Sequence, residues 1–186
     1  MAHMFLSSDL HLGHGNIIKY CNRPFRDAHH MNKSLIANIQ SRMTDKHDTL
    51  IHIGDFCCKG RERGVDGVRT SAGKWEERID RKIIHIVGNH DNNNGLNHAM
   101  EFAVIKIGQY RALLMHIPPL SGLFPTAAFD FVLCGHVHDR WKTQWANGVW
   151  FYNVGVDANK FMPVRIDEVI GLYQKEQRSL REVALN

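Results

Sequence analysis

Short apolar segments, several of which run directly into Asp, Asn or His, constrain the fold of this chain more than any other feature of its sequence. Each has four to six residues rich in Ile, Val, Leu and Phe, which is the length and composition of β-strands. We expect strands at residues 4–7, 49–53, 82–87, 102–107, 112–115, 131–134 and 149–154.

Apolar residues at helical spacing lie between some of these segments. Leu35, Ile36, Ile39 and Met43 recur at steps of three and four, which predicts a helix over 33–43, and further helices are expected over 73–81 and 167–176. Strands that alternate with helices early and follow one another closely later indicate a layered α/β fold with mixed strand directions. No repeat or low-complexity linker divides the 186 residues.

Polar side chains follow five of the expected strands. They are Asp9, His11, Asp55, Asn89, His116, His136 and His138. Functional residues of layered α/β folds gather at the carboxyl ends of strands. Asp9 and His11 are two residues apart, as are His136 and His138, so each pair points to one side if its segment is extended. Each pair could then hold one metal ion.

The chemistry of these side chains favours divalent cations. Imidazole, carboxylate and carboxamide groups bind such ions, and the set lacks the thiolates of a structural zinc site. Seven side chains exceed the needs of one ion, so we expect two ions, with Asp55 as the bridging carboxylate. The ligands favour Mn, with Fe, Ni, Co or Zn as alternatives. The four cysteines lack zinc-site spacing and are expected to be reduced thiols.

Two divalent ions ~3.5–4 Å apart suit in-line displacement at phosphorus, in which a metal-bound hydroxide attacks a phosphate ester. His90, next to Asn89, is the candidate group that assists the leaving oxygen. Asp91 is expected to orient His90 and to raise its basicity. His90 and Asp91 are therefore the catalytic candidates.

Two further residues are candidates for substrate binding. His14 lies three positions after His11 in a glycine-containing loop and is expected within reach of a phosphate. Arg23 is a candidate because guanidinium groups bind phosphate bidentately. His52 and His85 sit inside apolar strands, so we expect them to be buried, hydrogen-bonded to neighbours and without a chemical role.

The motifs, taken together, resemble the signature of the calcineurin-like metallophosphoesterase superfamily. In order they are Asp9-x-His11, Gly54-Asp55, Gly88-Asn89-His90-Asp91, the isolated His116 and Gly135-His136-x-His138, and they span most of the chain. The segments 8–18 and 153–157 further resemble a subgroup of small bacterial and phage phosphoesterases.

The resemblance implies a fold and a ligand arrangement. The fold is a four-layer sandwich of two facing mixed β-sheets flanked by helices, with the site at one edge. One metal would be held by Asp9, His11, Asp55 and His138, and the other by Asp55, Asn89, His116 and His136. Many members continue the Gly-Asp motif as Gly-Asp-x-x-Asp-Arg, whereas residues 54–61 read Gly-Asp-Phe-Cys-Cys-Lys-Gly-Arg. Another residue must therefore supply the phosphate contact of that arginine, or the contact is absent.

The ends of the chain and its composition bear on its cellular setting. Met1-Ala2-His3 is interpreted as a vector-derived scar, which leaves 4–186 as a single domain. The start lacks the basic flank and long apolar stretch of a secretory signal, so we expect a cytoplasmic protein. No run of ~18 apolar residues is present, which argues against a membrane span.

We therefore predict a metal-dependent phosphoric ester hydrolase that acts on a phosphomonoester or phosphodiester of a nucleotide, including a cyclic one, or of another small molecule. One alternative is a metal-dependent nuclease, although the formal net charge of only +4 is modest for a protein that binds extended DNA or RNA. A second alternative is a non-catalytic binding scaffold of the same fold, which the presence of all seven ligand candidates and His90 disfavours. The oligomeric state stays open.

Overall fold

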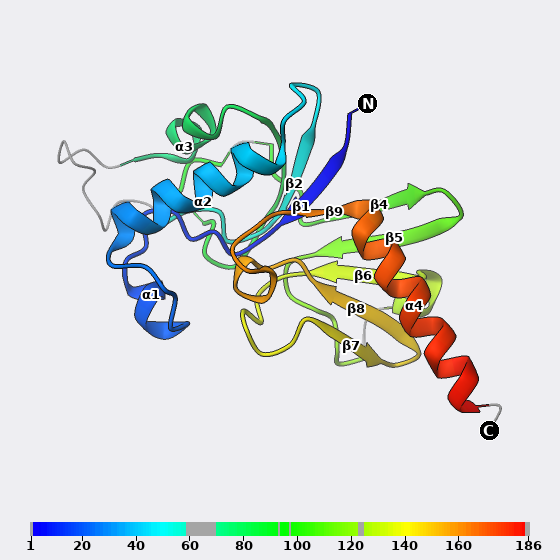
Figure 1. Ribbon diagram of the computed structural model, residues 1–186. Helices are drawn as coiled ribbons and strands as arrows, with labels where there is room; N and C mark the ends of the chain where they lie inside the picture. The colour runs from blue at the N-terminus through cyan, green and yellow to red at the C-terminus, as the bar shows by residue number, and fades with distance from the viewer. Residues whose placement is uncertain (1, 59–69, 93, 97, 123–124, 185–186) are drawn as a thin grey trace.

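Two mixed β-sheets form the centre of the protein in the computed structural model (Figure 1), which describes residues 2–58, 70–92, 94–96, 98–122 and 125–184. The first sheet has the strand order β3-β2-β1-β9. Strands β1, β2 and β3 are parallel and β9 is antiparallel to β1. The bounds are Met4–Ser7 for β1, Thr49–Ile53 for β2, Lys82–Ile86 for β3 and Val164–Arg165 for β9.

The second sheet has the order β4-β5-β6-β8-β7. Strands β5, β6 and β8 are parallel, and the outer strands β4 and β7 are antiparallel to their neighbours. The bounds are Phe102–Ile107 for β4, Tyr110–Met115 for β5, Phe131–Cys134 for β6, Thr143–Ala146 for β7 and Val149–Asn153 for β8. Two facing mixed sheets with helices are the expected fold class, which is confirmed.

The seven expected strands are present, with ends that differ by at most two residues from the prediction. Strands β7 and β9 were not expected. The sequence of β7 is Thr-Gln-Trp-Ala, and β9 has two residues, so neither carries an apolar run. Both are formed because their backbones pair with β8 and β1.

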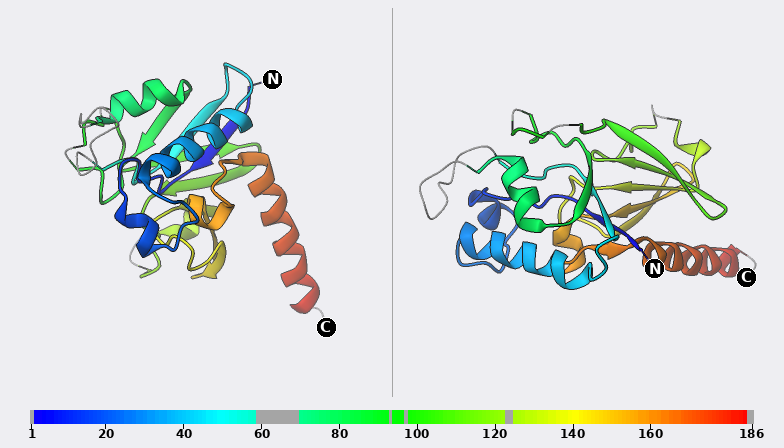
Figure 2. Two further views of the ribbon diagram at one scale, coloured as in Figure 1. Left: turned by 60° about the vertical axis from the view of Figure 1, so that its left-hand side comes forward. Right: turned by 90° about the horizontal axis from the view of Figure 1, so that it is seen from above.

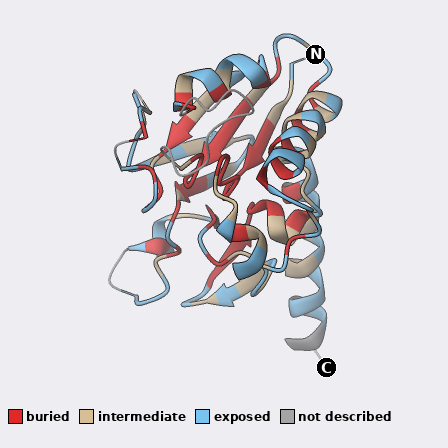
Figure 3. Cartoon of the chain, turned by 90° about the vertical axis from the view of Figure 1, so that its left-hand side faces the viewer, coloured by how far each residue is buried: buried red, intermediate tan, exposed pale blue. Residues whose placement is uncertain are grey.

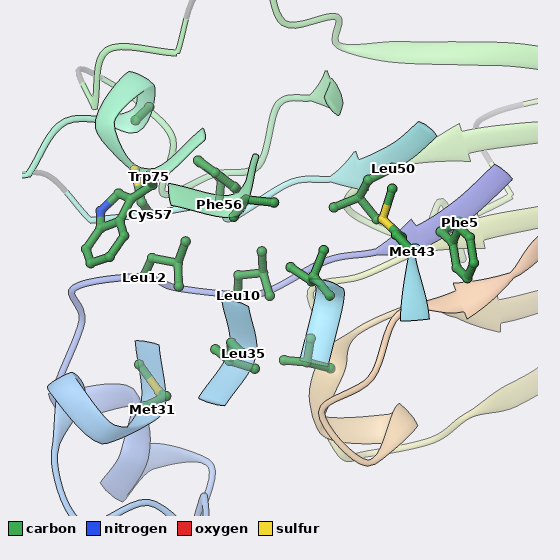
Figure 4. Packing of buried hydrophobic residues seen from close by; sticks show 14 of the residues in the cluster. Phe5, Leu10, Leu12, Met31, Leu35, Met43, Leu50, Phe56, Cys57 and Trp75 are labelled. Carbon is green, nitrogen blue, oxygen red and sulfur yellow. The ribbon is translucent and has the colours of Figure 1, made fainter. Parts of the chain in front are cut away.

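Helices α2 (Ala28–Arg42) and α3 (Ala72–Ile79) cover the outer face of the first sheet (Figure 1). Helix α2 begins five residues before the expected start because Asp27 caps it, accepting a hydrogen bond from the amide of His30 at 2.7 Å. Figure 4 shows the resulting core, in which Leu35 of α2 and Trp75 of α3 face residues of β1, β2 and their loops.

A second core fills the space between the sheets. Ile51 and Ile53 of the first sheet pack with Leu114 and Leu133 of the second. Helix α4 (Ile166–Ala184) adds Tyr173 to this core and then runs past the second sheet (Figure 2). Buried residues accordingly follow the strands, while the outward sides of the helices are exposed (Figure 3). No helix in the described ranges has the length and apolarity needed to cross a membrane.

The carboxyl ends of both sets of parallel strands meet at one edge of the sandwich. Ser8, which follows β1, forms a bridge with Gly155, which follows β8. The short helix α1 (Asn16–Tyr20), which was not expected, lies at the same edge (Figure 1). Loops from the two sheets are therefore brought together there, as the positions of the polar motifs predict.

Candidate metal centre

The seven predicted metal ligands converge at this edge. Asp9 and His11 follow β1, Asp55 follows β2, Asn89 follows β3, His116 follows β5, and His136 and His138 follow β6. Of the groups whose possible ligand atoms lie within 4.8 Å of one another, two consist of predicted ligands alone, namely Asp9 with His11 and His138, and Asp9 with Asp55 and His116.

Asp55 belongs to the second group and also faces His11 of the first. Its Oδ2 atom is 3.4 Å from Nε2 of His11 and 3.3 Å from Nε2 of His116. Its Oδ1 atom accepts a hydrogen bond from the backbone amide of His90 at 2.9 Å, which fixes the carboxylate plane. A single carboxylate oxygen that faces ligands of both groups is the arrangement that a bridging role requires.

Asn89 joins the second group. Its Oδ1 atom lies 3.2 Å from Nε2 of His116 and 3.0 Å from Nδ1 of His136. Nδ1 of His116 lies 2.8 Å from the carbonyl oxygen of Ile53, so it donates there and leaves Nε2 facing the cluster. Such a hydrogen bond on the far ring nitrogen is the usual way in which proteins orient a ligand histidine.

The segments that carry the two ligand pairs, 9–11 and 136–138, are not extended, so the condition under which each pair would point to one side is not met. Asp9, His11, Asp55, His136 and His138 have φ values between 50° and 70°, in the left-handed region. Residues other than glycine adopt this conformation rarely, and it tends to gather at functional sites. The ligands converge because the chain turns sharply at each of them, which a residue spacing does not reveal.

Two glycines of the motifs are required by close packing. A Cβ atom on Gly54, whose φ is +84°, would collide with the ring of His116. A Cβ atom on Gly135 would collide with Ser8 Oγ and would lie 2.5 Å from Oδ2 of Asp9. The backbone therefore approaches the ligands so closely that a side chain at either position would displace them.

The cluster fits cations. Asp9, Asp55 and His11 are almost fully buried, and neither ring nitrogen of His11 has a hydrogen-bond partner among the described residues. A buried imidazole without a hydrogen bond and two buried carboxylates are costly to place together, and a bound cation would compensate this cost. Oxygen and imidazole donors in this number suit divalent metals of the Mn to Zn series.

The electrostatics of the metal-free cluster follow from this burial. Burial raises the pKa of Asp9 and lowers that of His11 well below its usual value. For Asp55, burial opposes ionisation, but the hydrogen bond and charge of His116 and the charge of His11 hold its pKa below the ordinary range. Of the two carboxylates Asp9 and Asp55, Asp55 is therefore the one that stays ionised more readily.

Asp157 is a site residue that the sequence analysis did not single out by role. Its Oδ2 atom lies 2.8 Å from Nδ1 of His138, and the pKa of Asp157 is lowered by His138 and Arg23 in spite of burial. Asn153 donates to the carbonyl oxygen of His138 at 2.7 Å. The segment 153–157 was noted only for its resemblance, and here it holds His138 in place.

Arg23 does not contact the space where substrate would bind, so its predicted phosphate role is wrong. Its side chain is fully buried and donates to both carboxylate oxygens of Asp157 at 2.8 Å. It also donates to the carbonyl oxygens of Asp9 at 2.7 Å and Leu10 at 3.2 Å. All this places Arg23 beneath the metal ligands, where it fixes the loop after β1.

Asp91 likewise has a role other than the expected one. It accepts hydrogen bonds from the backbone amides of Asp55, Phe56 and Gly88 at 2.8–2.9 Å. A further bond comes from Asn94 Nδ2 at 2.8 Å. Its carboxylate thus ties the Asp55 turn to the turn after β3 and does not orient the imidazole of His90.

His90 is exposed, and its ring centroid lies 5.4 Å from that of His11 and 6.5 Å from that of His14. The three rings line a pocket of about 370 Å³ between helix α1 and segment 136–140, which we call the α1 pocket. The positions of His90 and His14 are therefore compatible with their predicted contacts to substrate, which stay predictions.

The histidines inside the strands are buried, as expected. His85 lies 2.7 Å from Oε1 of Glu76, which provides the expected hydrogen bond. Neither ring nitrogen of His52 has a partner in the described part of the chain, so the same expectation is wrong for His52. Burial lowers the pKa of His52 well below its usual value, and the ring packs against Phe56 as a neutral group.

All four cysteines are free thiols.

The two-sheet fold and the cluster of Asp, Asn and His side chains define the class of metal-dependent phosphoric ester hydrolases. The profile of the calcineurin-like phosphoesterase superfamily domain matches residues 4–167. The chain belongs to this superfamily.

Three known proteins are similar to this chain in sequence or in fold. The uncharacterized protein MJ1445 of Methanocaldococcus jannaschii is 32% identical over 186 residues, covering 94% of this chain and 93% of that protein. The crystal structure of AQ665, a protein of unknown function from Aquifex aeolicus, has the same fold, with a TM-score of 0.68 at 22% identity over 92% of this chain and 100% of that one. YfcE, a phosphoesterase from E. coli, matches with a TM-score of 0.48 at 16% identity, over 81% of this chain and 77% of that one.

Proposed function

We propose that this protein is a two-metal phosphoesterase that hydrolyses a phosphomonoester or phosphodiester of a nucleotide or another small molecule, with Mn as the preferred metal. The observation that carries the proposal is the position of Asp55 Oδ2, which lies 3.4 Å from His11 Nε2 and 3.3 Å from His116 Nε2. Asp9, His11, Asp55 and His138 would hold one ion, and Asp55, Asn89, His116 and His136 the other.

Bound divalent ions would supply positive charge that polarises phosphoryl oxygens and lowers the pKa of water. The protein contributes the remaining steps. His90, exposed on the wall of the α1 pocket, donates a proton to the leaving oxygen, and the bond from its amide to Asp55 fixes its backbone beside the ligands. His14 contacts the phosphate from the same wall. Asp91 positions the Asp55 turn through its backbone hydrogen bonds.

The experiment measures metal content and hydrolysis of an aryl phosphate together. The protein is stripped with EDTA, reloaded with Mn and compared with the variants Asp55→Ala and His138→Ala. We expect the stripped protein to be inactive, the reloaded one to hold two ions per chain, and both variants to lose metal and nearly all activity. The variant His29→Ala, altered at an exposed position of α2, serves as the control and should match the wild type.

Two results would contradict the proposal. Activity that survives EDTA in the wild type and in both variants would exclude metal-dependent hydrolysis. A protein that takes up no Mn after stripping and reloading would instead support the scaffold alternative.

A further inference from the structure

The α1 pocket adjoins the candidate metal ligands and has features that the hydrolytic chemistry leaves unused. One wall is helix α1, which contributes Ile17 and Tyr20, and the opposite wall includes Val137 and Arg140. Ligand pockets for small molecules have volumes of roughly 300–1,000 Å³. At about 370 Å³, this pocket has room for one small ligand.

Tyr20 is an aromatic residue with little packing. Its side chain is at the end of α1 and is 74% exposed, although it lines the pocket. Among the described residues, its ring contacts His14 edge-on, with a centroid separation of 6.3 Å. An exposed aromatic face beside a pocket offers a stacking surface for a planar group, and nucleobases stack on such faces.

Arg140 is a cation that the described part of the chain leaves without a partner. Its side chain is exposed, and its guanidinium makes no hydrogen bond or ion pair with a described residue. The guanidinium groups of Arg23, Arg42 and Arg165, in contrast, each donate to a carboxylate. Arg140 follows the ligands His136 and His138 by a few residues, so it belongs to the wall next to the metal centre.

The position of Arg140 bears on the arginine that is missing from the Gly-Asp motif. Guanidinium groups bind phosphate oxygens in a fixed bidentate geometry. Residues 59–61, which follow the Gly-Asp motif, lie outside the described residues, and Arg23 is committed to Asp157. Among the arginines of the described chain, Arg140 is the one that lines the α1 pocket.

We propose that the α1 pocket selects phosphate esters of single nucleosides, with the base stacked on Tyr20 and a phosphate oxygen bound by Arg140. This inference rests on the proposed function and names its substrate class. Ile17 and Val137 provide apolar surface for the nucleoside, and the exposed carboxylate of Asp139 at the rim is an acceptor for its hydroxyl groups. The volume suits one nucleotide and not a longer strand.

The test measures equilibrium binding of two ligands that differ only in the base. The ligands are the nonhydrolysable methylenephosphonate analogues of AMP and of ribose 5-phosphate, titrated calorimetrically into the Mn-loaded protein. We expect the AMP analogue to bind about tenfold more tightly, as is typical of one base–aromatic stack. Tyr20→Ala should bring the two affinities to within about twofold, and Tyr20→Phe should preserve the difference.

Arg140→Gln should weaken both ligands by the same factor of about ten, because it removes a contact to the phosphate that they share. Phe102→Ala, at an exposed aromatic residue of β4, and Arg178→Gln, at an exposed position of α4, are the matched controls and should change neither affinity.

Three results would overturn the inference. They are equal affinities of the two analogues for the wild type, a base preference that survives Tyr20→Ala, and much tighter binding of a ten-nucleotide single strand than of the AMP analogue. Because the analogues are not hydrolysed, the binding measurements do not depend on the result of the activity assay. Loss of the base preference with normal hydrolysis would refute only the pocket assignment.

Discussion

The Oδ2 atom of Asp157 lies 2.8 Å from Nδ1 of His138, and this contact orients the imidazole of a candidate metal ligand. The ionised carboxylate accepts the Nδ1 proton, which leaves Nε2 of His138 facing Asp9 at 4.0 Å. Arg23 holds the same carboxylate from the other side. The three side chains form a hydrogen-bonded chain beneath one half of the candidate metal centre, in which Arg23 and Asp157 are buried and His138 is partly exposed.

Asp157→Asn should lower the affinity of that half for Mn by about 10- to 100-fold, the usual cost of removing a carboxylate behind a ligand histidine. Metal content at limiting Mn, measured by mass spectrometry of the purified protein, checks this. Asp139→Asn, an exposed carboxylate of the neighbouring loop, is the control. Wild-type Mn affinity in the Asp157 variant would show that the hydrogen bond does not tune His138.

Arg23→Ala should destabilise the fold by about 3–5 kcal/mol, because Asp157 would stay buried beside His138 but would lose the guanidinium that compensates its charge. Denaturant unfolding of the metal-free protein measures this loss. Arg26→Ala, which removes an exposed ion pair with Asp27, should leave the unfolding transition in place. If Arg23→Ala instead left stability unchanged and raised KM, the phosphate role indicated by the sequence would be restored.

His90→Gln should reduce kcat by about 10²- to 10⁴-fold, the usual contribution of a general acid, while the protein keeps its metal. Metal binding should survive the loss of kcat because His90 contacts the candidate ligand Asp55 through its backbone amide, which the substitution retains. Rate and metal content are measured on the same samples. An equal fall in both would mean that His90 supports the metal centre and is not the acid.

The stability of the metal-free protein should fall as pH rises from about 6.5 to about 9. Burial alone would lower the pKa of His116, but its hydrogen bond to Asp55 and the charges of Asp9 and Asp55 raise it to about 9. Protonated His116 therefore stabilises the fold fully below the unfolded-state pKa of about 6.5, and this contribution is lost as pH passes the folded-state value.

Melting temperatures in EDTA across this pH range provide the measurement. His116→Gln should flatten the decline, although not completely, because the pKa of His138 is also raised, mainly by Asp157 and Asp9 against the effect of burial. His29→Gln should keep the full slope. An unchanged slope in His116→Gln would show that His116 is not the group responsible.

The strands and the convergence of the candidate ligands could be predicted from the sequence because both depend on local patterns. Apolar runs set β1, β2 and β6 almost to the residue, and the ligand candidates follow strands whose carboxyl ends share one edge. Helix α1 has five residues and strand β9 has two, so their stability comes from contacts with the rest of the fold and not from their own sequences.

By itself, then, the sequence determined which chemistry the site carries, since the identity of Asp9, Asp55 and the histidines fixes the donor atoms. Only the tertiary structure decided which partners the charged residues around the site have. Arg23 and Asp157 are 134 residues apart in the chain and meet in a buried ion pair, whereas Arg140 lines the pocket and pairs with no described residue. Charge and residue type are properties of one position, but the partner of a charge depends on how distant loops pack, and sequence spacing does not record that.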